Sequence, residues 1–214
     1  MQNFITIHSP EILHITDEQG TIFYGANQTW YPTFWQQQSG CGPTACANIL
    51  WYLSKTKPAC TGLADYVDNQ KQQFLPLMEN TWKYVTPGRM GVNRTEIFCE
   101  GIKQYGKDFH VPLKCHTLNV PDHKFRRFSI EKVSSFLIEM LEKNLPVAFL
   151  NLSNGKLTNL ESWHWVTVTG FYPEKKTAVM YDQGIRQKID IEYWFRTSLL
   201  GGGFVAVEPI LSER

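Results

Sequence analysis

Hydrophobic and polar residues follow a helical period in the stretch after Pro43. The apolar positions there fall three or four residues apart, at Ala45, Cys46, Ile49, Leu50 and Leu53. Side chains with this spacing share one side of a helix, so the pattern predicts a helix with one buried face. Pro43 suits the first turn of such a helix, because the N–H that proline lacks would have no partner there. Cys41 is therefore expected at, or just before, the helix N-terminus.

Three further stretches carry a helical period. The range 129–141 is the clearest, with Ser129 placed to cap its first turn, and 93–106 has a second apolar face. The range 61–72 predicts another helix, and its apolar positions are Leu63, Tyr66 and Val67. Residues 74–91 are expected to be mixed in structure, with breakers at Pro76, Pro87 and Gly88.

Strand-like runs dominate the second half of the chain. They cover 112–120, 147–150, 165–171, 178–181, 186–191 and 204–207. Residues 192–197 predict a short helix or turn, and residues 1–34 look extended and irregular. Helices first and strands later predict an α+β fold. We expect one two-lobed domain over residues 1–214, mainly helical to about residue 110 and sheet-rich from about residue 111.

Composition narrows the classes of function. The 214 residues are 43% hydrophobic and 14% aromatic, which is enough for a substantial core. A net charge of +1 predicts no basic surface for nucleic acid or for anionic membranes. No apolar run approaches the roughly 18 residues of a membrane span, and the N-terminus lacks the pattern of a signal peptide. We identify no cofactor motif.

The cysteines indicate the redox compartment. Their number is odd and their spacing shows no paired motif, with thiols at Cys41, Cys46, Cys60, Cys99 and Cys115. This usage favours reduced thiols and a cytoplasmic protein over a disulfide framework. A secreted protein would require that a signal peptide had already been removed.

Cys41 is the candidate nucleophile. A helix N-terminus presents free backbone N–H groups and the positive end of the helix dipole, which favour thiolate over thiol. Ser39, Gly40 and Gly42 leave little bulk around the sulfur. The alternative is a buried cysteine that acts as a small apolar side chain. A core cysteine needs none of these neighbours.

A thiolate nucleophile needs a base that also serves as an acid for the leaving group. His164 stands at the start of the apolar strand 165–171, after a polar loop. The next strand ends at Asp182, so a hairpin between the two strands would place Asp182 beside His164. Asp182 could then orient the imidazole. The alternatives are a histidine packed for structure and a turn aspartate before Gly184.

These residues resemble the papain-like cysteine peptidase superfamily, in particular its bacterial C39-like branch. The matching segments are Gln36-Gln37-Gln38, Cys41-Gly42-Pro43-Thr44-Ala45, His164-Trp165-Val166 and Asp182-Gln183-Gly184. The resemblance covers about residues 35–190 and rests on short motifs. It implies a helical lobe, with the cysteine at the N-terminus of a central helix, packed on an antiparallel sheet. It also implies that Cys41 is the nucleophile, His164 the base and acid, and Asp182 the orienting residue.

A glutamine side chain and the Cys41 backbone N–H are the candidate donors to the developing oxyanion. The family glutamine usually stands six positions before the cysteine, where this chain has Trp35. We assign the role to Gln36, one position closer, and Gln37 and Gln38 remain alternatives.

The leading hypothesis is hydrolysis of a peptide or isopeptide bond through a Cys41 thioester, with a peptide or protein as substrate. An acyltransferase or transglutaminase-like enzyme would use the same residues with an amine acceptor. A binding protein without activity is a third hypothesis. A fourth is a metal-binding module, whose candidate ligands are Cys99, His110, Cys115 and His116, although their spacing lacks paired zinc motifs.

Overall fold

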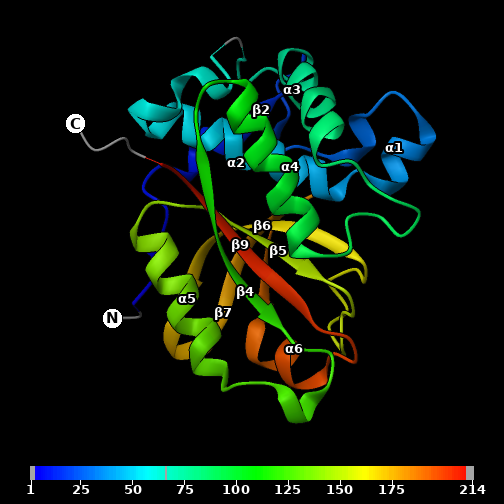
Figure 1. Ribbon diagram of the computed structural model, residues 1–214, viewed down its shortest axis with the longest axis vertical. Helices are drawn as coiled ribbons and strands as arrows, with labels where there is room; N and C mark the ends of the chain where they lie inside the picture. Colours follow the sequence, from blue (N-terminus) through cyan, green and yellow to red (C-terminus); the bar gives the residue numbers. More distant parts are fainter. Residues whose placement is uncertain (1–2, 66, 211–214) are drawn as a thin grey trace.

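An antiparallel sheet and a group of helices occupy opposite ends of the molecule (Figure 1). The computed structural model describes residues 3–65 and 67–210. The helices are α1 (Phe34–Ser39), α2 (Cys41–Thr56), α3 (Lys71–Tyr84), α4 (Thr95–Asp108), α5 (Ile130–Glu142) and α6 (Ile191–Thr197). The first four gather at the end opposite α6, and α5 lies alongside the sheet.

Seven strands form the main sheet in the order β4-β9-β5-β6-β7-β8, and β1 pairs with β6. These strands are β1 (Ile5–Thr6), β4 (Leu113–Val120), β5 (Val147–Asn151), β6 (His164–Tyr172), β7 (Thr177–Asp182), β8 (Ile185–Asp190) and β9 (Gly202–Pro209). Every pairing is antiparallel. A second sheet joins β2 (His14–Thr16) to β3 (Ile22–Tyr24). The predicted α+β fold is confirmed.

The centre of the sheet is covered on both faces. All of β5 is buried, as is β6 from His164 to Phe171. Strands of this kind read as continuous apolar runs instead of alternating ones. Both α2 and α5 pack against β5 and β6. The sheet therefore supplies a rigid base for side chains at the ends of its central strands.

Helix α2 is more deeply buried than its pattern predicted. Every residue from Cys41 to Ser54 is buried, because α2 lies between the sheet, α3 and the 3-10 turn Pro58–Leu63. A helix enclosed in this way needs partners for its polar side chains. Asn48 has two, since its Nδ2 donates to Thr167 Oγ1 at 3.1 Å and its Oδ1 accepts from the Ala26 N–H at 3.0 Å.

The helix predicted over 61–72 is wrong. Residues 58–63 form a 3-10 turn and α3 begins at Lys71, while Tyr66 lies outside the described residues. The stretch expected to be mixed, residues 74–91, is helical as far as Tyr84, and Pro76 lies inside α3. The proline removes one backbone hydrogen bond. Burial of Phe74, Leu77, Met78 and Thr81 on one face of α3 compensates.

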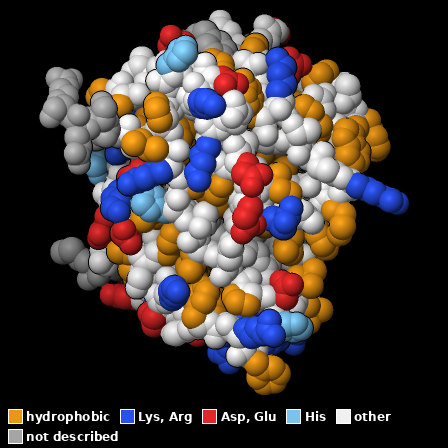
Figure 2. Space-filling model, viewed as in Figure 1, with side chains coloured by type: hydrophobic (Ala, Val, Ile, Leu, Met, Phe, Trp, Pro, Cys, Tyr) orange, Lys and Arg blue, Asp and Glu red, His pale blue; other side chains and the backbone are white. Residues whose placement is uncertain are grey.

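Other predicted elements are confirmed. Ser129 caps α5 by accepting from the Glu131 N–H, and α4 covers the apolar face predicted over 93–106. On the face shown in Figure 2, acidic and basic side chains are interspersed, in keeping with a net charge near zero. Among the described residues, no helix has the length and hydrophobicity required to cross a bilayer.

Candidate active site

Cys41 is the first residue of α2, as the pattern around Pro43 predicted. The preceding residue, Gly40, is the N-cap and offers no side-chain hydrogen bond to the free N–H groups of the first turn. These groups and the helix dipole therefore act on whatever charge lies at the N-terminus. A Cβ on Gly42 would lie 2.9 Å from Val92 Cβ, so glycine is needed where the chain packs closely beside the sulfur.

His164 and Asp182 form a buried pair at the mouth of the sheet. The predicted hairpin is confirmed: β6 and β7 pair antiparallel around the turn Pro173–Lys175. His164 Nε2 lies 2.6 Å from Asp182 Oδ1, and the two residues are only 4% and 8% exposed. Gln183 and Gly184 then turn the chain with φ angles of 47° and 78°. The burial of both side chains strengthens the ion pair, because the local dielectric is lower than that of water.

The start of β6 is fixed from the neighbouring strand. Asn151 on β5 is the register partner of His164. Its Nδ2 donates to the Glu161 carbonyl, and its Oδ1 accepts from the Trp194 indole N–H at 2.7 Å. This buried amide ties the loop that precedes His164 to β5 and to α6. Sequence reasoning missed Asn151, because its role depends on strand register.

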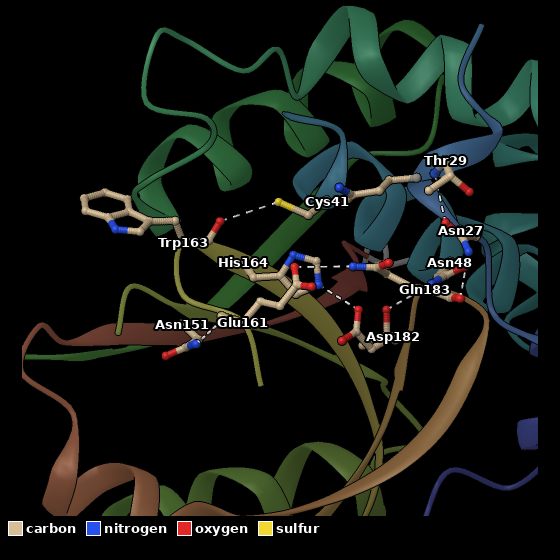
Figure 3. Close-up of polar contacts among 12 residues, drawn as sticks. Asn27, Thr29, Cys41, Asn48, Asn151, Glu161, Trp163, His164, Asp182 and Gln183 are labelled. Atoms are coloured by element: carbon tan, nitrogen blue, oxygen red, sulfur yellow. Dashed lines mark hydrogen bonds and ion pairs between the residues drawn. The ribbon is translucent and has the colours of Figure 1, made fainter. Parts of the chain in front are cut away.

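The imidazole faces two groups that favour its charged form. Burial lowers the pKa of His164, but hydrogen bonds with Asp182 and Cys41 outweigh it and raise that pKa well above its ordinary value. Asp182 occupies Nε2, so Nδ1 is the nitrogen available to the sulfur. Figure 3 shows His164 between the two. The Cys41 thiol also lies 4.0 Å from the Trp163 carbonyl oxygen.

The three adjacent glutamines lie in α1, a helix that the sequence reasoning did not predict. Gln36 closes a capping box: its Oε1 accepts from the Thr33 backbone N–H at 3.3 Å, and Thr33 Oγ1 accepts from the Gln36 N–H. Gln37 donates from Nε2 to the Tyr31 carbonyl at 2.8 Å. Gln38 is exposed. The oxyanion role assigned to Gln36 stays a prediction, and the side chain on which it rests caps the helix.

Gln28 is a fourth glutamine near Cys41, and sequence reasoning missed it. It lines a small cavity of about 10 Å³ together with Cys41, His164 and Asp182. Its Nε2 donates to the Gln37 carbonyl at 2.7 Å, while its Oε1 is buried without a partner among the described residues. The expected spacing from the cysteine concealed Gln28, because α1 is inserted between them.

The residues proposed for a metal module do not form one. Within 3–65 and 67–210, no group of three or more His, Cys, Asp or Glu side chains is placed to hold a metal ion. His116 Nε2 instead lies 2.9 Å from Glu208 Oε1, on the sheet away from Cys41. The geometry gives the metal-binding hypothesis no support.

The chain is similar to one protein family and to a solved structure. The model of the peptidase C39-like family matches residues 27–196, which include Gln28, Cys41, His164 and Asp182. No curated protein matches the chain. A solved double glycine motif protease from an AMS/PCAT transporter, in complex with the leader peptide, is similar with 16% identity and a TM-score of 0.42, covering 79% of this chain and 84% of that one. Because the family model matches most of the sequence, the chain belongs to the C39-like family of cysteine peptidases.

Proposed function

We propose that the protein hydrolyses a peptide or isopeptide bond through a thioester at Cys41. The observation that carries the proposal is the buried His164–Asp182 pair, at 2.6 Å, facing a cysteine at an uncapped helix N-terminus. A raised pKa at His164 favours imidazolium, and imidazolium beside the sulfur favours thiolate. This combination is the activated nucleophile that acyl transfer needs.

The reaction has two halves. The Cys41 thiolate attacks the carbonyl carbon, forming the C–S bond, and the carbonyl oxygen takes the electron pair. His164 then gives its Nδ1 proton to the departing nitrogen, the C–N bond breaks and a thioester remains. Water next loses a proton to His164 and attacks the thioester, and the thiolate leaves with an acid as the product. Asp182 holds the ring in one orientation throughout.

The developing oxyanion needs donors on the opposite side from the leaving group. The Cys41 backbone N–H is one, at the start of α2. We propose Gln28 as the second, because its amide shares the cavity of Cys41 and His164. One N–H of its amide is held by the Gln37 carbonyl, which fixes the group and leaves the other N–H for substrate.

Comparing two glutamines tests that assignment. Gln28→Ala should lower kcat by about 10²-fold, the effect of removing one oxyanion donor. Gln36→Ala removes only a helix cap and should leave kcat nearly unchanged while lowering the melting temperature. Steady-state kinetics with thermal unfolding separate the two effects. A large loss of kcat in Gln36→Ala, with Gln28→Ala unaffected, would return the role to Gln36.

Thiol labelling tests the activated nucleophile. With iodoacetamide at low pH, Cys41 should be modified first, as read by mass spectrometry of all five thiols. Burial raises the pKa of Cys46, and it raises that of Cys60 to about 11, so both should stay unreactive. Cys115, which is only half-buried, is the stricter comparison. Modification of Cys115 ahead of Cys41 would contradict an activated sulfur.

A peptide thioester tests the second half-reaction. Mixed with the enzyme in water and several amines, it should yield mainly the acid, with a Cys41-linked acyl adduct visible in the intact mass. An amide as the main product would instead identify a transferase that uses the same residues.

A further inference from the structure

A second cavity opens beside Cys41, on the side away from the imidazole. It has a volume of about 230 Å³, and its lining residues are Gln38, Ser39, Cys41, Met90, Gly91 and Trp163. His164 lines the small cavity on the other side of the sulfur and is not among these residues. The nucleophile therefore stands between two recesses of different size and chemistry.

Two large apolar side chains border the cavity, and both are exposed. Met90 is 59% exposed, on the segment between α3 and α4, and Trp163 is 46% exposed, just before β6. Exposing such side chains forgoes the free energy that their burial would contribute. Both side chains flank the nucleophile. Exposed apolar side chains grouped in this way indicate a binding surface, whereas single ones scattered over a protein do not.

The backbone holds both side chains in unusual positions. Trp163 has a φ of 57°, a left-handed conformation that is costly for an aromatic residue. Met90 lies within a tight turn, where Gly88 and Gly91 exchange backbone hydrogen bonds of 3.2 and 3.0 Å. Gly91 has a φ of 69°, and a Cβ there would meet no atom within 4 Å. The strained backbone at Trp163 therefore keeps an apolar group at the border of the cavity. Gly91 has no side chain, so it leaves the cavity unfilled.

The chemistry of the reaction indicates which part of a substrate enters this cavity. The leaving nitrogen must receive its proton from His164, so the leaving group lies on the imidazole side of Cys41. The acyl part then extends to the other side of the sulfur, where the larger cavity lies. Apart from the reacting sulfur, none of its lining residues carries a formal charge, so a charged substrate side chain would lose water without gaining an ionic partner.

We propose that this cavity is the specificity subsite of the enzyme and takes an apolar side chain from the acyl side of the scissile bond, between Met90 and Trp163. The proposal rests on the proposed function of Cys41. Met90 and Trp163 then determine which substrates acylate the enzyme, while His164 and Asp182 determine how fast any bound substrate reacts.

Acyl thioesters provide the test, because they report acylation without a demanding leaving group. Two series, N-acetyl-Gly-X and N-acetyl-X-Gly thioesters with X as Leu, Gly, Asp or Lys, cover both nearest positions. In at least one series, kcat/KM for Leu should exceed that for Asp by about tenfold or more. Equal rates for all X, or a preference for glycine or for charged residues in both series, would overturn the proposal.

Variants test whether the preference for an apolar side chain arises at this cavity. Met90→Ser should lower the Leu-to-Gly ratio of kcat/KM by about tenfold. Arg89→Ser changes the adjacent exposed residue, which does not line the cavity, and should leave the ratio as it is. A Met90→Ser ratio equal to that of the wild type would overturn the proposal. If no thioester, including plain acetyl, acylates Cys41, the proposed function itself fails; acylation without side-chain preference removes the subsite alone.

Discussion

Replacing Cys41 with alanine should lower kcat for peptide hydrolysis by a factor on the order of 10⁶, the loss seen when a covalent hydrolase loses its nucleophile. The thioester needs the sulfur, and an alanine side chain offers no atom to form it. The fold should remain, because Cys41 is one small side chain at the start of a helix buried along most of its length. Thermal unfolding and steady-state kinetics on the same preparation would show the two effects separately.

Cys46→Ala is the matched control. Cys46 lies in the same helix and is fully buried, so its removal tests the effect of losing a thiol from α2 without touching the site. We expect this variant to lose some stability and to keep its kcat. Full turnover by Cys41→Ala on any substrate of the wild type would end the assignment of the nucleophile.

The pattern of apolar residues was sufficient to predict those helices whose buried positions recur with a helical period. The spacing of apolar residues gave α2 and α5, and the Ser129 cap set the start of the latter. Where local and tertiary effects oppose each other, the pattern was insufficient. Pro76 argues against a helix in the sequence, yet α3 forms around it because Phe74 and Leu77 are buried on one face.

The candidate site likewise contains residues that the sequence pattern could identify and one that it could not. Antiparallel pairing brings the end of one strand beside the start of the previous strand, so the predicted hairpin was enough to expect Asp182 beside His164. Gln28 could not be found by spacing from the cysteine, since α1 intervenes. The sequence did hold a signal for α1: Thr33 followed three residues later by Gln36 is a capping box, which commits the Gln36 side chain to the helix.

Burial in this protein serves the chemistry as well as stability. The same enclosure that dries the His164–Asp182 bond also disfavours a charged imidazole, and only the neighbouring carboxylate and sulfur reverse that effect on its pKa. Removing one of them should therefore reveal the opposing effect of burial. Asp182 is the more informative residue to change, because the proposed nucleophile, Cys41, then remains in place.

Asp182→Ala should lower kcat by about 10³-fold, and Asp182→Asn by about 10²-fold, since an amide oxygen still accepts from the ring N–H. The variants should also change the pH profile. Activity should fall at high pH when His164 loses its proton, and the raised pKa of His164 should place this limb above the ordinary range of histidine. Without the carboxylate that pKa falls, so the basic limb of kcat/KM should move to lower pH in both variants.

Glu161→Gln is the control for a nearby charge. Glu161 reaches Gln183 at 3.4 Å beside the pair, but it is not among the groups that raise the pKa of His164. Its removal should leave the basic limb where it is. A limb that stays fixed in Asp182→Asn, or that moves as far in Glu161→Gln, would show that the Asp182 carboxylate does not hold the proton on His164. If only Asp182 variants move it, the imidazolium that protonates the leaving group is kept charged at working pH by one buried hydrogen bond.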